Sequence, residues 1–191
     1  MALTPSVVTT SFSQAWCSIA QGRFLPFLLL ALGTASNVLY AHTPLVAFAA
    51  MSGVSLCRRR AIAVALGIWL VNQVVGFGIR GYPLTGTAFL WGALMGVGTL
   101  LVVGLASLRP AFSQSSWAGH FLWVLIAATA GFGLYQGLIL LAYPVLVAGH
   151  SMGWDIVSKL FSKQMAWAGA IALGQGALLW RQAALLDSAQ P

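Results

Sequence analysis

Long apolar stretches separated by short polar breaks run along most of the chain. Six of them are long enough, or nearly long enough, to cross a bilayer as a helix, which takes about 20 residues. They cover residues 24–41, 44–57, 60–80, 86–107, 118–147 and 164–185. The second is short, because Pro44 and a triplet of arginines bound it. The pattern therefore predicts six helices, of which the second is the shortest.

The composition favours a membrane protein over a soluble one. Hydrophobic residues make up 60% of the 191 residues and charged residues only 6%, whereas about a quarter of a soluble domain is charged. With so few charges, the chain has too little polar surface to face water on all sides. We therefore expect an all-α integral membrane protein, with a six-helix membrane domain over residues 23–186. A loosely ordered arm over residues 1–22 and a tail over residues 187–191 would flank it.

The basic residues predict how the helices are oriented. The formal net charge is +7, but the nine basic residues are scattered, apart from the triplet at 58–60. Nucleic-acid binding needs clustered phosphate contacts, so we expect no nucleic-acid partner. If both termini are cytoplasmic, Arg80, Lys159 and Lys163 fall outside and the other six basic residues inside. That distribution obeys the positive-inside rule.

A polar stripe follows one face of the third segment. Trp69, Asn72, Gln73, Phe77 and Arg80 are spaced i, i+3, i+4, i+8 and i+11, so they share a helix face. Amides in hydrocarbon need partners, so this face should look into the bundle. Two interpretations stay open: hydrogen bonds between helices, or the polar wall of a cavity at the outer end of the helix.

Other polar residues could meet this stripe in an outer pocket. Small-molecule sites are concave and mostly apolar, with a few convergent polar groups. The candidate ligand-contacting residues are Tyr40, His42, Trp69, Asn72, Gln73, Phe77, Arg80, Tyr82, Tyr135 and His150.

Two further patterns concern packing. Trp154, Val157 and Phe161 fall on one face of a short stretch before the sixth segment, which predicts a separate amphipathic helix at the outer interface. Small residues four apart occur as the pairs Ala31/Ala35 and Gly92/Gly96. Such pairs indicate close helix packing, or docking against another membrane protein.

Motifs for catalysis are missing from the sequence. The chain has no G-x-x-x-x-G-K-[ST], HExxH or GxSxG motif, and its only acids are Asp155 and Asp187. General acid–base catalysis and a dedicated proton relay need more titratable groups than this. We therefore expect a transporter or a substrate-binding subunit rather than an enzyme, and no prosthetic group.

Three stretches resemble a known family. They are ALGTA (31–35), WLVNQVVGFGIRGYP (69–83) and FLWG (89–92). With the small size and the six expected helices, they are similar to the S components of energy-coupling-factor (ECF) transporters, and more closely to the BtuM group of cobalamin transporters. The resemblance implies uptake of vitamin B12 or a related corrinoid across a bacterial inner membrane, with the ligand bound on the periplasmic side. It also implies an ECF-type membrane partner that docks on Ala31 and Ala35, although BtuM-like members can work without a dedicated ATPase module.

The resemblance also bears on the cobalt ligand. Some members ligate cobalt through a cysteine in the outer pocket, but here Cys57 stands beside the arginine triplet and Cys17 precedes the first segment. Both should lie on the cytoplasmic side. Among the remaining donors, an imidazole at an outer helix end is suitable. We therefore expect His42, ahead of His150, to contact the metal.

Two other classes of function fit the sequence. One is a carrier or channel-like protein for another small solute or a metal ion, which His42, His150 and Met152 could bind. The other is a noncatalytic subunit that assembles with a membrane partner through its small-residue faces.

Overall fold

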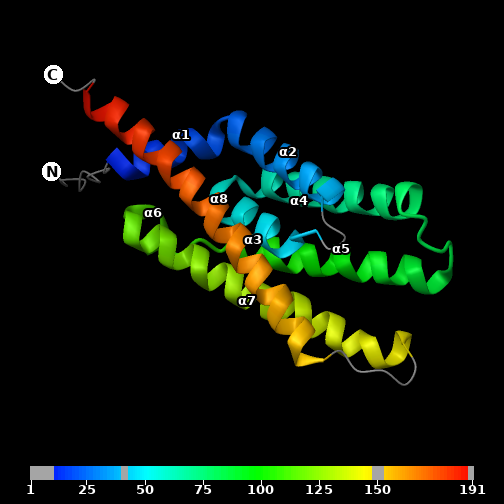
Figure 1. Cartoon of the computed structure of the whole chain (residues 1–191). Coiled ribbons are helices and arrows are strands. Elements are labelled where there is room, and N and C mark those ends of the chain that lie inside the picture. Colours follow the sequence, from blue (N-terminus) through cyan, green and yellow to red (C-terminus); the bar gives the residue numbers. More distant parts are fainter. Residues whose placement is uncertain (1–10, 40–42, 148–152, 189–191) are drawn as a thin grey trace, which may run out of the picture.

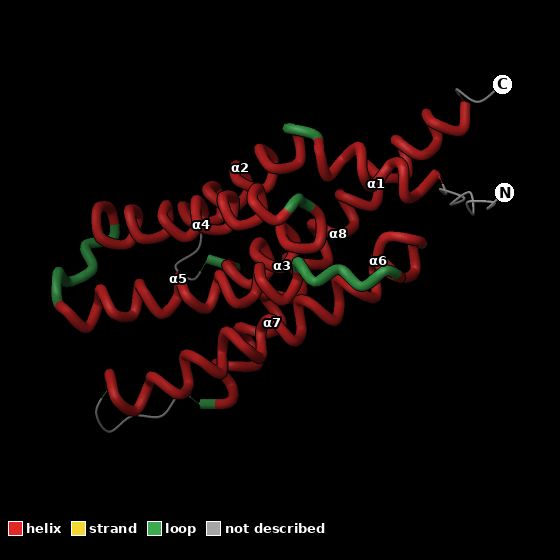
Figure 2. Tube along the Cα trace, turned by 180° about the vertical axis from the view of Figure 1, so that it is seen from behind, coloured by secondary structure: helices red, strands yellow, loops and turns green. Residues whose placement is uncertain are grey.

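The computed structural model describes residues 11–39, 43–147 and 153–188, and all regular structure in these ranges is helical. Figures 1 and 2 show an elongated helical bundle. Its elements are α1 (Ser11–Gln21), α2 (Phe24–Leu39), α3 (Leu45–Ser55), α4 (Arg58–Val74), the π-helical turn η1 (Val75–Ile79), α5 (Gly86–Ala106), α6 (Phe112–Ser115), α7 (Trp117–Leu146) and α8 (Trp154–Ser188). The described ends of the chain lie at the same end of the bundle, and the turn between η1 and α5 lies at the other. The all-α class is thus confirmed.

Several helices have the length and hydropathy of membrane spans. Three qualify within the described residues: α4 with η1 (22 residues), α5 (21 residues) and α7 (30 residues). A fourth forms if α1 and α2, which meet at a bend of 61°, count as one broken span. Each of the six predicted segments is largely helical, but length and composition support only these three or four spans. The second segment is the clearest exception, since α3 has 11 residues and is about 16 Å long.

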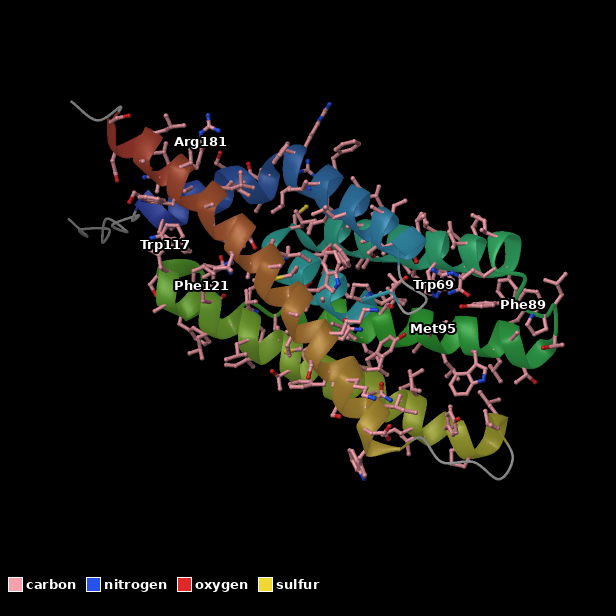
Figure 3. All side chains as sticks on the ribbon, in the orientation of Figure 1. Trp69, Phe89, Met95, Trp117, Phe121 and Arg181 are labelled. Carbon is pink, nitrogen blue, oxygen red and sulfur yellow. The ribbon has the colours of Figure 1, made fainter. Side chains whose placement is uncertain are left out.

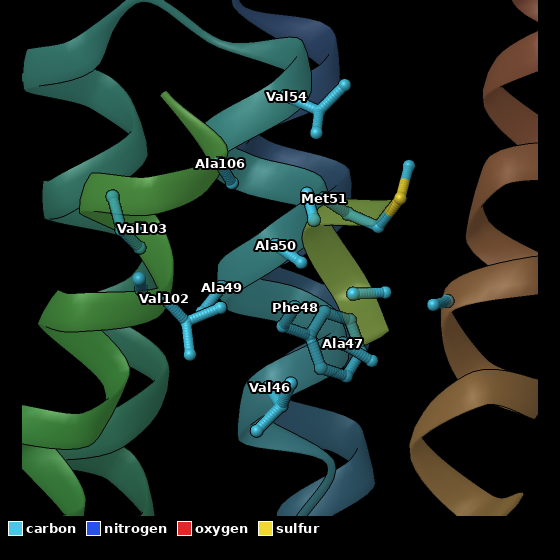
Figure 4. Close-up of a cluster of buried hydrophobic side chains, with 14 of the residues drawn as sticks. Val46, Ala47, Phe48, Ala49, Ala50, Met51, Val54, Val102, Val103 and Ala106 are labelled. Atoms are coloured by element: carbon cyan, nitrogen blue, oxygen red, sulfur yellow. The ribbon is translucent and has the colours of Figure 1, made fainter. Parts of the chain in front are cut away.

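This short helix occupies the centre of the bundle. All 11 residues of α3 are buried, and it packs against α4, α5, α7 and α8. Figure 4 shows Phe48 and Met51 of α3 among apolar side chains that include Val102 and Val103 of α5. A helix that is apolar on every side is stable only when other helices surround it. The sequence of α3 therefore explains its central place.

Glycine sets the distance between α3 and α5. A Cβ atom added at Gly53 would lie 2.5 Å from Cβ of Ala106 and 2.9 Å from the carbonyl oxygen of Val103. Both distances are shorter than van der Waals contact, so only glycine lets the two backbones approach this closely.

Two arginines bind the carbonyl groups at helix C-termini. Arg109, at the turn after α5, donates from Nε to the carbonyl oxygen of Gly53 at 2.8 Å and from Nη2 to that of Leu56, at the end of α3. Arg60 donates from Nη1 to the carbonyl oxygens of Gln21 and Gly22, at the end of α1. These carbonyls have no partner within their own helix, and a positive charge is favourable at this end of the helix dipole.

The environment of Arg109 keeps its guanidinium in place. Its carbon Cζ lies 5.6 Å from the ring centroid of Trp16, a cation–π distance. Burial lowers the pKa of Arg109, and nearby Cys57 has the smaller, opposite effect; an arginine stays protonated in any case. Arg109 is thus a charged anchor between α1, α3 and α5.

The N-terminal segment is more ordered than predicted. Residues 11–21 form α1, in which Phe12, Ala15, Trp16 and Ala20 are buried and cluster with Leu179 and Ala183 of α8. The expectation of a loosely ordered arm is therefore wrong for these residues. Their i, i+3, i+4 spacing is the signal that predicts such a helix. Residues 1–10 and 189–191 lie outside the described residues.

The amphipathic stretch after residue 153 is not a separate helix. It forms the first turns of α8, which runs from Trp154 to Ser188 without a break, so that prediction is wrong. No glycine or proline occurs between Trp154 and Ala168, and a helix continues where nothing interrupts its hydrogen bonds. Val157 is buried against the core, which joins this stretch to the bundle.

The close approach at Gly53 gives a first prediction. Gly53→Ala should lower the free energy of unfolding by about 1–3 kcal/mol, because the added methyl group overpacks the contact with α5. In the matched control Gly104→Ala, the new Cβ meets no atom within 4 Å, so the stability should stay equal or rise slightly. Thermal unfolding of both purified variants in detergent measures the difference. Equal melting temperatures would show that α3 and α5 can separate at no cost.

The second prediction concerns the arginine that caps α3. Arg109→Ala should destabilise the protein by about 3 kcal/mol, since two hydrogen bonds to a charged group are lost. Arg58→Ala removes the same charge from an exposed position at the start of α4 and should change the stability by less than about 0.5 kcal/mol. Denaturant titration of both variants checks this. Similar losses in both would mean that net charge, and not the cap, explains the effect.

Candidate functional site

The predicted outer pocket corresponds to the end of the bundle away from the described chain ends. There α4, η1 and α5 extend beyond the start of α3, which begins only part-way along the bundle (Figure 1). The residues near the start of α3 therefore lie inward of η1 and of the turn between η1 and α5 along the bundle axis.

A buried polar cluster lies where the chain enters α3. The hydroxyl of Thr43 donates to Oδ1 of Asn37, and its oxygen lies 3.3 Å from Oδ1 of Asn72. Asn37 Nδ2 donates to the carbonyl oxygen of Gly33 at 2.9 Å. The cluster joins α2, the start of α3 and α4. Asn72 thus takes part in contacts between helices, which was the first of the two interpretations.

Two long side chains add hydrogen bonds near this cluster. Arg80 donates from Nη2 to the carbonyl oxygen of Asn37 near the end of α2. Gln164 of α8 accepts at Oε1 from the backbone N–H of Ala47, in the first turn of α3, at 3.0 Å. Arg80 was among the predicted site residues, whereas Gln164 was not. In the sequence, Gln164 is visible as a polar amide at the edge of an apolar segment, but its hydrogen-bond partner can be found only from the fold.

Trp69 and Gln73 point toward α5 instead. Trp69 Nε1 donates to the carbonyl oxygen of Gly92 at 2.9 Å, and a Cβ atom at Gly96 would lie 2.8 Å from the Trp69 ring. A Cβ atom at Gly92 would overlap with the amide of Gln73. The Gly92/Gly96 pair therefore serves close packing, as one of its two interpretations proposed. The polar stripe of α4 is divided between two neighbours, with Asn72 on one side and Trp69 and Gln73 on the other.

An aromatic cluster covers the outer end of the α4–α5 hairpin. The rings of Phe77 and Phe89 stack with centroids 4.8 Å apart, and Tyr82 meets Phe77 edge-on at 6.1 Å. Tyr82 and Phe89 remain 42% and 53% exposed, so part of this cluster is accessible from the surface of the bundle. Phe89 is labelled in Figure 3.

The backbone beneath this cluster is unusual. The N–H of Arg80 donates to the carbonyl oxygen of Val75 at 2.9 Å, the i→i+5 bond of a π-helical turn. Gly81 has a positive φ of 67°, which glycine adopts at no steric cost. A Cβ atom at Gly76 would lie 2.7 Å from the Tyr82 ring. The glycines of this stretch thus turn the chain and let Tyr82 fold back onto η1, and π-helical turns are often found at functional sites.

The remaining candidates separate into two groups. Tyr135 packs on Gly98, where a Cβ atom would lie 2.6 Å from its ring, so it belongs to the interface of α5 and α7. Tyr40, His42 and His150 lie outside the described residues, and the metal contact of His42 stays a prediction. Within residues 11–39, 43–147 and 153–188, no three His, Cys, Asp or Glu side chains gather as a metal site would need.

The sequence missed two aromatic residues near this end. Trp91 of α5 and Tyr143 of α7 pack with centroids 5.9 Å apart. Each occurs in an apolar segment without a polar neighbour, so nothing in the pattern distinguished it from a lipid-facing residue.

The cysteines and the alanine pair lie away from the outer end. Cys57 is exposed just before α4, at the turn that follows α3. Ala31 and Ala35 are exposed on α2. The neighbouring Gly33 is buried and packs so closely on Ile68 that an added Cβ atom would overlap with that side chain. Close packing inside the bundle therefore uses Gly33, and docking of a partner on Ala31 and Ala35 stays a prediction.

Comparisons with protein-family models, with curated proteins and with solved structures found no match to this chain. The arrangement of its own residues is therefore the basis for the function considered below.

The third prediction concerns Asn72 and Gln73, which belong to the polar stripe of α4 but contact different neighbours. Asn72→Leu should destabilise the protein by about 1 kcal/mol, because a buried contact with Thr43 is lost. Gln73→Leu should leave the stability unchanged or higher, since Nε2 of Gln73 is buried without a hydrogen-bond partner in the described residues and its removal relieves that cost. Melting temperatures in detergent compare the two. A larger loss for Gln73→Leu would contradict these contacts.

Proposed function

We propose that the protein takes up vitamin B12 or a related corrinoid through the inner membrane of a bacterium, and that the ligand binds at the outer end of the bundle. The observation that supports this most is the exposed aromatic cluster of Phe77, Tyr82 and Phe89 beside Arg80. These residues belong to the stretches 69–83 and 89–92 on which the resemblance to the BtuM group rests.

The chemistry of the outer end suits such a ligand. A corrinoid presents a broad ring system, against which flat aromatic side chains pack well. It also carries amide groups, which hydrogen-bond with arginine and amide side chains. Uptake needs binding and release rather than bond chemistry, so the shortage of acids in this sequence is no obstacle.

The depth of α3 supports the same location. Because α3 starts part-way along the bundle, its polar entrance at Asn37, Thr43 and Asn72 lies inward of the aromatic cluster. We propose that these side chains form the inner limit of the ligand site. Half-length helices that begin near the middle of a bilayer are a recurrent way to build transport sites.

The charge distribution supports the proposed orientation. Arg23, Arg109 and the triplet at 58–60 belong to turns or helix starts in the half of the bundle that carries the described chain ends, and Arg181 is in the last turns of α8. Arg80 follows η1 at the other end, and Lys159 and Lys163 are in the first turns of α8. By the positive-inside rule the first end is cytoplasmic and the aromatic cluster periplasmic.

A second candidate function is that of an assembly subunit. The face of α2 that carries Ala31 and Ala35 also exposes Phe27 and Val38, each to 71%. A bilayer can cover such a face, and so can a helix of an ECF-type membrane partner. If a partner docks there, Ala31→Trp should reduce uptake and leave ligand binding intact.

The fourth prediction tests the ligand with purified protein. Titration with hydroxocobalamin, followed by absorbance, should give saturable binding, and protein from corrinoid-fed cells should be coloured. Phe77→Ala should weaken binding about five- to tenfold, which is the usual effect of losing one aromatic contact. Cys57→Ala should bind as the wild type does, because Cys57 lies at the other end of the bundle.

Three other results would each point elsewhere. Binding of stoichiometric metal without binding of corrinoid would favour a metal carrier. Absence of binding of either metal or corrinoid would favour an assembly subunit. Loss of binding in Cys57→Ala with an unchanged melting temperature would place the site at the other end of the bundle.

A further inference from the structure

A groove runs between α2 and α8 on the side of the bundle. The two helices pack mainly on other neighbours, α2 on α4 and α8 on α1, α3 and α7, and a cleft is left between them. Its inner part is a cleft of about 150 Å³ that Leu25, Leu28, Leu29 and Leu32 line along α2. The opposite wall includes Gly174 and Leu178 of α8. This part of the groove is therefore almost wholly apolar.

The groove widens at the end of the bundle that carries the described chain ends. There a second cleft of about 360 Å³ lies between α8 and the bend from α1 to α2, and Leu25 and Leu178 line both clefts. This mouth is less apolar than the inner part, because Ser18, Arg181 and Gln182 contribute to its wall beside Ile19 and Leu185. The two clefts thus form one continuous groove with an apolar inner part and a mouth of mixed polarity.

Positive charge surrounds this mouth. Arg181 is exposed (Figure 3), and within the described residues no hydrogen bond or ion pair neutralises it. Arg60 reaches the rim through its bond to the carbonyl oxygen of Gly22, and Arg23 is the next residue along. The nearest acid in sequence is Asp187, more than a turn further along α8. An anionic group at the mouth would meet Arg181, which lines the cleft, with Arg23 and Arg60 adding positive charge next to the lining residue Gly22.

We propose that this groove is a binding site for an anionic phospholipid of the surrounding leaflet. One acyl chain would lie between α2 and α8, and the phosphate would lie at the mouth beside Arg181. Basic pockets between helices at the membrane surface bind anionic headgroups. This site is independent of the proposed corrinoid site, which is at the other end of the bundle.

The dimensions favour a lipid chain over a protein helix. A helix with its side chains is about 10–12 Å across, and a cleft of about 150 Å³ is too small to receive one. A single file of methylene groups needs less width. Since lipid tails are as apolar as leucine, the chain alone gives little selectivity. The charge at the mouth must therefore distinguish this lipid from a neutral one.

Native mass spectrometry of the purified full chain tests the proposal. Phosphatidylglycerol and phosphatidylcholine with identical acyl chains are titrated separately. Phosphatidylglycerol should bind more tightly, and Arg181→Gln should weaken it about fivefold, the usual effect of one basic residue on an anionic lipid. Arg58→Gln removes the same charge at an exposed position of α4, and it should change the affinity less than twofold.

A second pair of variants tests the groove itself. Gly174→Leu should reduce the binding of both lipids at least fivefold, because the new side chain fills the cleft. Gly169→Leu on the same helix is the control, since neither glycine has an atom within 4 Å of an added Cβ and both variants should fold.

Several results would overturn the proposal. Equal affinities for the two lipids would show that the groove has no specific site for an anionic headgroup. Equal effects of Arg181→Gln and Arg58→Gln would show that the preference for phosphatidylglycerol comes from the overall positive charge of the surface. Unchanged binding in Gly174→Leu would show that lipid does not enter the groove. A dimer that Gly174→Leu dissociates would identify a second copy of the chain as the occupant.

Discussion

A short helix that other helices surround leaves the backbone groups at its ends without water to bind, and this constraint governs the packing at the centre of the structure. The buried helix α3 has this problem at both ends. At its N-terminus, Gln164 of α8 binds the N–H of Ala47. At its C-terminus, Arg109 binds the carbonyl oxygens of Gly53 and Leu56. The partners come from α8 and from the turn after α5. The backbone groups at both ends of α3 therefore find hydrogen-bond partners only when the bundle has assembled around it.

Because α3 extends along only part of the bundle, the two halves of the bundle differ in what fills them. The half that carries the described chain ends is filled by α3 and fixed by arginines, and there the lipid groove has its mouth. The other half has polar residues around the start of α3 and an aromatic cluster on the π-helical turn. The proposed corrinoid site is placed in this half because the aromatic cluster and Arg80 are there.

The helix positions could be predicted because apolar runs of about 20 residues have few alternatives. The sequence also suggested that the second segment was exceptional, since Pro44 and the arginine triplet shorten it. It could not show that Asn72 and Gln73, adjacent in the chain, turn to different neighbours, because that depends on where α5 and Thr43 lie. The long-range bonds of Arg109 and Gln164 were unpredictable for the same reason. The order of α1 and the unbroken start of α8 were missed, although their spacing was visible.

The central claim, a corrinoid site at a periplasmic outer end, can be tested most directly by thiol labelling of intact cells. In a background of Cys17→Ser and Cys57→Ser, a Tyr82→Cys variant is treated with a membrane-impermeant maleimide, with and without cobalamin. Tyr82 is 42% exposed, so we expect rapid labelling of the new cysteine and protection by cobalamin. Labelling of Cys57 from outside in the protein that keeps its native cysteines, or labelling at position 82 that cobalamin leaves unchanged, would contradict the claim.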